Sequence, residues 1–144
     1  IFFVIDYRAD FKQATNLDAG QANMLTAVLE ILVKDGILKQ TDGIVIIISK
    51  SDYMPQNEDR NVFANMYLKE NYLYFINILT GHVKSHGINK ANNYKPYIVP
   101  FSLGKFMLGR TFTYNPDDST VVVNAILALS RVNRKKKIWN ILKR

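Results

Sequence analysis

The hydrophobic pattern of this chain consists of three short apolar runs, separated and followed by longer amphipathic stretches. The runs occupy residues 2–6, 43–48 and 97–102. Apolar side chains follow one another in these runs without regular alternation, which is typical of parallel strands that are covered on both faces. Pro100 has no N–H to donate to a ladder, so the third strand is expected to be short or irregular there.

Two amphipathic stretches lie between the runs and predict helices. Residues 16–34 carry a helical stripe, and Asp35-Gly36 is expected to stop that helix. A second stripe predicts one helix over residues 60–84. The stripes consist of Leu25, Val28, Leu29 and Leu32 in the first stretch, and of Tyr72, Phe75, Ile76, Leu79 and Val83 in the second.

A third helix is expected after the last run. Asp117, Asp118 and Ser119 offer side-chain oxygens that can cap its first turn, and acids there suit the helix dipole. Lys136 would point into the apolar face, so the helix is expected to end, or to leave the core, near residues 133–137. That face comprises Val122, Ala125, Ile126, Leu129 and Val132.

The order strand, helix, strand, helix, strand, helix predicts an α/β fold. Right-handed crossovers make such a chain a three-layer sandwich with a mostly parallel, doubly wound sheet, as in Rossmann-like and P-loop NTPase folds. No internal repeat or low-complexity linker divides the 144 residues, so one domain over residues 1–144 is expected. Ligands of such folds bind beyond the carboxyl ends of the strands, which is where the candidate chemistry is sought.

Composition narrows the class of protein. The chain is 48% apolar and 22% charged, which is ordinary for one globular domain. It has no cysteine, which excludes disulfides and thiolate metal sites. The longest aliphatic run, residues 44–48, is too short to span a bilayer, and no signal peptide is visible. A soluble cytoplasmic protein is therefore expected.

The first run begins almost at residue 1, with no initiator Met and no lead-in. Natural domains seldom open inside a core strand. The chain is therefore expected to be a piece of a longer protein, or one that has lost an N-terminal part.

The net charge of +7 is concentrated in one segment. Residues 119–144 hold seven of the 19 Lys and Arg residues and no acid, so the rest of the chain has 12 basic and 12 acidic residues. The basic C-terminal tail, from about residue 134, can contact nucleic acid, an anionic membrane or another domain. A solvated helix end is the alternative, because cations there also complement the helix dipole.

The carboxyl ends of the second and third runs carry the most specific signals. Ser49-Lys50-Ser51-Asp52 resembles the Asn/Thr-Lys-x-Asp motif that closes the corresponding strand of GTPases, and Ser102-Leu103-Gly104 looks like the Ser-Ala-x motif of the same family. The resemblance covers most of the chain. It corresponds to the C-terminal half of a G domain in the Ras-like and translation-factor class of P-loop NTPases, and is similar to bacterial proteins described as ATP/GTP-binding.

The resemblance implies a site for the base of GTP or GDP. Guanine presents two donors on one edge, N1–H and the 2-amino group, and the Asp52 carboxylate can accept both. Adenine lacks this donor pair, which gives discrimination. The stem of Lys50 can lie along the base, and backbone N–H groups of residues 102–104 can donate to guanine O6.

The chain departs from the family at several positions. Ser49 stands where Asn or Thr is usual, and Leu103 stands where a small Ala is usual. The stretch between the two motifs is also long.

The phosphate-binding half of such a domain is not found. No Gly-x-x-x-x-Gly-Lys-Ser/Thr loop occurs in the sequence, and Gly104-Lys105 lacks the first Gly and the following hydroxyl. Nor does an Asp-x-x-Gly segment for magnesium precede the first run. Because phosphoryl transfer depends on those parts, no catalytic residue is assigned, and Mg²⁺ is expected only with a missing N-terminal half.

Two other groups of residues can be weighed as sites. Asp6 and Asp10 suggest a magnesium or acidic catalytic site, but a strand-end turn and a loop acid explain them better. His82 and His86 are spaced for one helix face, yet no third zinc ligand is evident, so surface histidines are favoured. No metal site is predicted.

Two functional classes remain open. The first is a guanine-nucleotide-binding, GTPase-like domain fragment that supplies the base-recognition motifs, with hydrolysis only if an upstream phosphate loop completes it. The second is a non-catalytic α/β interaction domain, a degenerate G domain, that binds a protein or anionic partner through its basic C-terminal helix. The expected partners are a guanine nucleotide and the missing N-terminal half or another domain.

Overall fold

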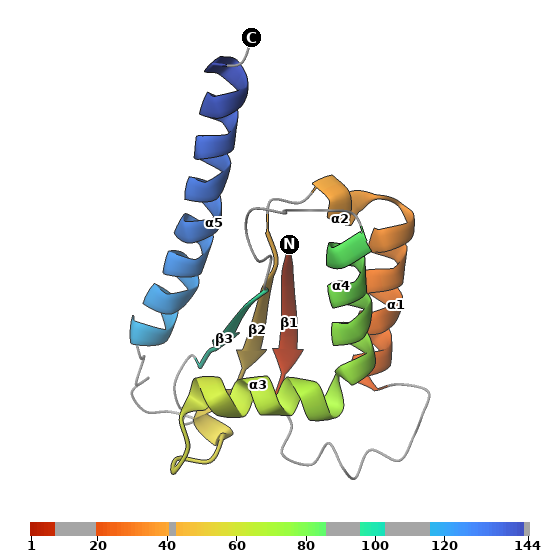
Figure 1. Ribbon diagram of the computed structural model, residues 1–144. Coiled ribbons are helices and arrows are strands. Elements are labelled where there is room, and N and C mark those ends of the chain that lie inside the picture. The colour runs from red at the N-terminus through yellow and green to blue at the C-terminus, as the bar shows by residue number, and fades with distance from the viewer. Residues whose placement is uncertain (8–19, 41–42, 86–95, 103–115, 143–144) are drawn as a thin grey trace, which may run out of the picture.

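The computed structural model describes the backbone of residues 1–7, 20–40, 43–85, 96–102 and 116–142. Side chains are described over the same ranges apart from residues 39–40, 82–85 and 130–142. Within these ranges the chain forms an α/β fold with a sheet of three parallel strands and several helices (Figure 1).

The sheet contains all three predicted strands. They are β1 (Phe2–Asp6), β2 (Val45–Ser49) and β3 (Tyr97–Pro100), in the order β1-β2-β3. Both neighbouring pairs are parallel, and β2 lies in the centre. β3 is the shortest strand, with four residues, and ends at Pro100 on an edge of the sheet. The limit that proline places on this strand was therefore predicted correctly.

The first helix, α1 (Gln21–Lys34), ends where the sequence predicted. Asp35 is its C-cap, and Gly36 has φ +71°, a left-handed conformation that glycine adopts without steric cost. The Gly36 N–H donates to the Val33 carbonyl at 3.1 Å. The chain then forms a short helix, α2 (Ile37–Gln40), which the sequence analysis did not predict.

The second predicted helix is two helices, α3 (Arg60–Asn71) and α4 (Leu73–Ser85). The break falls at Tyr72, whose φ and ψ are −127° and 27°. Tyr72 is fully buried, and its hydroxyl donates to Oε1 of Gln21 at 2.8 Å. Figure 1 shows α3 running across the strand ends and α4 running alongside α1. One straight helix cannot cover both surfaces, so the prediction of a single helix was wrong.

The last helix, α5 (Pro116–Leu142), begins near its predicted start. Asp118, which was expected as a cap, is instead buried and bonds to Arg60 and Ser102. The sequence left two outcomes open near residues 133–137, the end of the helix or its departure from the core. The helix does not end there but continues to Leu142, and Figure 1 shows its later part projecting beyond the other elements.

Alternate residues of β2 belong to two apolar clusters. Ile46 and Ile48 belong to the larger cluster, in which helices α1, α3 and α4 also take part. Val45 packs in a smaller cluster with Val99 of β3 and Ala125 of α5. The larger cluster contains Phe3, Ile5, Leu25, Leu29, Leu38, Ile44, Ile46, Ile48, Met54, Ala64, Tyr67, Leu68, Tyr72, Phe75 and Leu79.

β1 does not meet the expectation that both faces of every strand are covered. Phe3 and Ile5 are buried, whereas Phe2 and Val4 are 50% and 54% exposed. The reason lies in the position of α5, which contacts β3 and packs against Val45 and Val99 but leaves β1 uncovered on that face (Figure 1).

Candidate functional site

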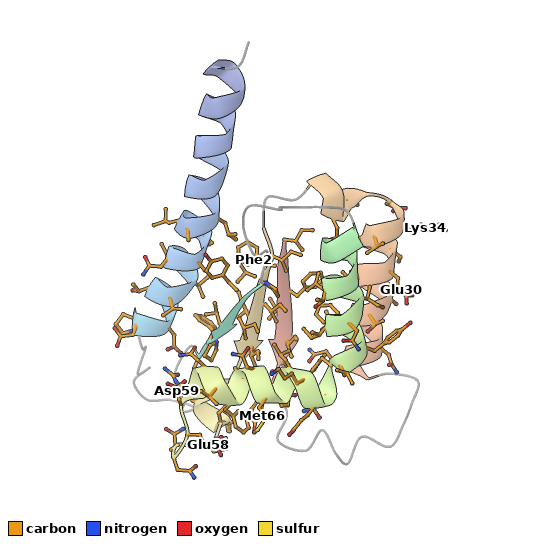
Figure 2. All side chains as sticks on the ribbon, viewed as in Figure 1. Phe2, Glu30, Lys34, Glu58, Asp59 and Met66 are labelled. Carbon is orange, nitrogen blue, oxygen red and sulfur yellow. The ribbon has the colours of Figure 1, made fainter. Side chains whose placement is uncertain are left out.

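The candidate site lies beyond the carboxyl ends of the three strands, next to α3. The chain leaves β1 at Asp6, leaves β2 into the short helix η2 (Ser51–Tyr53), and leaves β3 at Pro100, shortly before Ser102. Figure 2 shows side chains gathered between these strand ends and α3, with Glu58 and Asp59 on the loop that enters α3. Polar groups from distant parts of the sequence therefore meet at one end of the sheet, as the fold rule predicts.

Asp52 and Ser102 are joined directly. The Ser102 hydroxyl donates to Oδ1 of Asp52 at 2.7 Å. The backbone supports this pairing, because the Phe101 N–H donates to Ile48 at 2.8 Å and the Ser51 N–H donates to Phe101 at 3.1 Å. Asp52 and Ser102 therefore lie close together beyond the carboxyl ends of the adjacent strands β2 and β3.

The other carboxylate oxygen of Asp52, Oδ2, has no hydrogen-bond donor among the described residues. The side chain is only partly buried. A carboxylate can accept several hydrogen bonds, and Ser102 uses only one acceptor position. Asp52 therefore has acceptor capacity left on an oriented carboxylate, which suits a ligand that presents N–H donors.

Lys50 points to the neighbouring strand rather than to Asp52. Its backbone is left-handed, with φ 57° and ψ 36°, and its ammonium bonds Oδ2 of Asp6 at 2.9 Å. The Lys50 side chain is still 56% exposed, so its aliphatic stem is accessible from solvent. The ammonium is held at the end of β1.

Ser49 links the ends of β1 and β2. Its hydroxyl is within 3.2 Å of both the Ile5 carbonyl and Oδ1 of Asp6. Asp6 also accepts Lys50, and its own N–H donates to Oε1 of Gln21 at 3.0 Å. The Ser49 hydroxyl therefore ties the end of β2 to the neighbouring strand β1.

A charge pair at the site, between a buried carboxylate and a partly exposed guanidinium, was missed by sequence reasoning. Arg60, the first residue of α3, forms two hydrogen bonds to Asp118, at 2.9 and 3.2 Å. The Ser102 N–H donates to Asp118 at 2.8 Å. The sequence signalled an acid pair at the start of a helix, which fits a cap equally well. Nothing in it linked Asp118 to an arginine 58 positions earlier.

Most of the remaining candidate residues lie outside the part of the chain that the structure describes. Leu103, Gly104, Asp10 and His86 lie outside the described residues, as does the side chain of His82. No group of three or more His, Cys, Asp or Glu side chains that can hold a metal ion occurs in the described part of the chain.

Comparison with protein-family models, with curated proteins and with solved structures found no match for this chain. Over the described ranges, no helix is both long enough and apolar enough to cross a membrane.

Proposed function

We propose that this chain is the base-recognition half of a GTPase-like domain, in which Asp52 binds guanine. The observation that carries the proposal is the 2.7 Å bond from Ser102 to Oδ1 of Asp52, which leaves Oδ2 without a donor among the described residues. The finer fold that goes with it is a three-layer, doubly wound sandwich related to P-loop NTPases. GTP or GDP in a cytoplasmic protein is then the expected ligand.

The residues at the strand ends fit a guanine base. One partly exposed carboxylate, oriented by a hydroxyl, can accept N1–H and the 2-amino group together. An adenine base brings no such donor pair and would leave a partly desolvated carboxylate facing a ring nitrogen. The stem of Lys50 is exposed enough to lie along a base, and Ser49 braces the loop that carries Asp52. Leu103 and Gly104 complete the proposed site through the backbone.

This proposal assigns no catalytic residue to the chain. Most of the binding energy of a triphosphate comes from a phosphate loop at a helix N-terminus, and the sequence holds no such loop. Weak nucleotide binding and no turnover are therefore expected from the chain alone. Mg²⁺ and hydrolysis belong to a phosphate-binding half supplied by another segment.

Exposed apolar surface supports such a partner. Phe2 and Val4 of β1 are about half exposed on one face of the sheet. On α1, Met24, Val28 and Ile31 are also exposed, at a spacing that places them along one side of the helix. Single exposed apolar residues are ordinary, but several exposed apolar side chains on a strand face or along a helix stripe suit a packing partner. We propose the phosphate-binding half, or another domain, as that partner.

The test is a competition titration of GTP, xanthosine triphosphate and ATP against the complete protein and its Asp52→Asn variant. Asn keeps the size of Asp52 but presents an amide donor, which opposes the 2-amino group of guanine and matches the 2-oxygen of xanthine. The preference for GTP over xanthosine triphosphate should fall by roughly tenfold or more, since each mismatched hydrogen bond costs about 1–3 kcal/mol.

The control for this titration is Glu58→Gln, which removes one negative charge from an exposed position on the loop before α3. It should leave the order of preference unchanged. If Asp52→Asn also leaves that order unchanged, Asp52 has a structural role only, and the guanine assignment is wrong.

A second candidate function rests on α5. Its backbone remains helical to Leu142 and projects beyond the sheet, which presents the basic segment of the sequence away from the rest of the molecule (Figure 1). A degenerate G domain that binds an anionic partner would use this arm. The two functions separate on deletion of residues 135–144, which should abolish salt-sensitive binding to a polyanion such as heparin and spare guanine selectivity.

A further inference from the structure

Asp118 is a buried carboxylate that connects three parts of the molecule. It sits in the first turn of α5, and its side chain is only 4% exposed. Arg60 of α3 donates to both of its oxygens, and the Ser102 N–H donates to Oδ2 at 2.8 Å. The Ser51 hydroxyl lies 3.5 Å from the same oxygen and accepts from Arg60 at 3.1 Å.

These contacts involve Ser51 and Ser102, the neighbours of Asp52, rather than Asp52 itself, which is the proposed base-binding residue. Ser51 precedes Asp52 in the chain, and Ser102 donates its hydroxyl to Asp52. Asp118 thus holds the residue before Asp52 and also the residue that orients the Asp52 carboxylate. The path from Asp118 to Oδ1 of Asp52 consists of two hydrogen bonds, of 2.8 and 2.7 Å, through a single residue.

Attachment of α5 to the sheet does not require the charge pair between Arg60 and Asp118, because α5 already packs against the apolar side chains of Val45 and Val99. Burying a carboxylate is costly unless its oxygens are fully hydrogen-bonded, and replacing buried ion pairs by apolar residues is often neutral or stabilising. The charge pair fixes the orientation of the Asp118 carboxylate, because a bidentate guanidinium and a backbone N–H together define the plane of that group.

We propose that Asp118 is a positioning residue of the base site, which sets the orientation of Asp52 through Ser102 and Ser51. The inference rests on the guanine-binding function proposed above. Arg60 fixes Asp118 in turn, so α3 and α5 are both coupled to the nucleotide. A change in the position of α5 is transmitted to guanine selectivity through this bond path.

The experiment compares Asp118→Asn with Asp117→Asn in the full protein. The two acids are adjacent in the first turn of α5, so both variants lose the same favourable interaction with the helix dipole. Asp117 is exposed, whereas Asp118 is buried. Two quantities are measured for each variant: hydrogen exchange of the Ser102 amide without nucleotide, and the ratio of GTP to ATP affinity. Thermal melting shows whether each variant folds.

In Asp118→Asn, the Ser102 amide should exchange on the order of tenfold faster, because a charge-assisted acceptor is lost and an amide donor now faces Arg60. The ratio of GTP to ATP affinity should fall by a similar factor. Amides in the centre of β2 should keep their protection, which a general loss of stability would not allow. Asp117→Asn should change neither quantity.

A second variant, Arg60→Lys, covers the case in which Asp118→Asn does not fold. It keeps the positive charge but loses the bidentate geometry, so a smaller change of both quantities is expected. Unchanged exchange at Ser102 in a folded variant overturns the inference, and so does a change that Asp117→Asn shares. A wild-type protein without preference for GTP over ATP contradicts the proposed function instead, and Ser102 exchange still decides whether Asp118 positions the loop.

Discussion

Lys50 occupies a backbone conformation that L-residues avoid. Within the described ranges it is the non-glycine residue with positive φ, and such a conformation costs about 1–2 kcal/mol. The turn sends the Lys50 side chain to Asp6 on β1, while the next two residues face the end of β3. One strained residue therefore allows a single loop to contact both neighbouring strands.

Because Lys50 has a left-handed backbone conformation, glycine should be more stable than alanine at this position. Lys50→Gly should be about 1 kcal/mol more stable than Lys50→Ala, since both lose the ion pair with Asp6 but only glycine adopts φ 57° without steric cost. At the exposed position Lys69 in α3, the order should reverse by a similar amount. Urea unfolding of the four variants measures both differences. If alanine is as stable as glycine at position 50, the left-handed turn is incorrect.

The sequence allowed side-chain partners to be predicted only where both residues lie at the ends of neighbouring parallel strands. Asp52 and Ser102 each follow an apolar run, so parallel pairing alone brings them together. The ion pair from Lys50 to Asp6 depends on a left-handed residue that no propensity favours at lysine. The pair from Arg60 to Asp118 depends on where α3 and α5 begin in space, which helical periodicity does not fix.

At the scale of elements, α5 packs closely on the chain that enters β2. A Cβ atom added at Gly43 would lie well inside van der Waals contact with the side chain of Leu129. The Gly43 carbonyl also accepts the N-terminal amine of Ile1 at 2.8 Å. The lack of a side chain at residue 43 thus lets α5 approach the sheet, and this glycine is needed for close packing rather than for a turn.

Gly43→Ala should therefore destabilise the protein by about 1–3 kcal/mol, the usual cost of overpacking. Trimming the facing side chain in the double variant Gly43→Ala, Leu129→Ala should recover part of that loss relative to additivity. Gly81 in α4 is the control, because nothing lies within 4 Å of an added Cβ there, and Gly81→Ala should stabilise by up to about 1 kcal/mol. If the effects of Gly43→Ala and Leu129→Ala on the free energy of unfolding are additive, the close contact between residues 43 and 129 is incorrect.

The strands were more predictable than the helices for a physical reason. Each strand in the described part of the chain coincides with an apolar run of the sequence. No Gly or Pro lies near Tyr72 in the stripe over residues 60–84, so the sequence carries no local signal for the break there. The bend arises because α3 must cross the strand ends while α4 packs along α1, and tertiary packing overrides helical periodicity.

At the scale of the whole molecule, the basic residues of the C-terminal segment begin at Arg131, in the later part of α5. Among the side chains that the structure describes, Val122, Ala125 and Leu129 of α5 take part in the smaller apolar cluster. From Leu129 to the end of α5 at Leu142 the helix extends about 20 Å, at about 1.5 Å per residue. Figure 1 shows this part of α5 beyond the sheet and the other helices. Of the two outcomes expected near residues 133–137, the end of the helix is excluded, because α5 continues to Leu142.

Deletion of residues 135–144 should cost little stability, less than about 1 kcal/mol, because Figure 1 shows the later part of α5 projecting beyond the sheet and the other helices, and chain ends that are not docked contribute little to folding. The melting temperature by circular dichroism measures this, with the helical signal falling by the share of the deleted turns. Leu129→Ala in the full chain is the matched comparison. It removes a partly buried side chain from the smaller cluster and should cost more, about 1–3 kcal/mol. The reverse order, with the deletion more harmful than Leu129→Ala, would mean that Trp139 or its neighbours anchor the core. In that case the basic segment would be part of the folded unit rather than an arm for a partner.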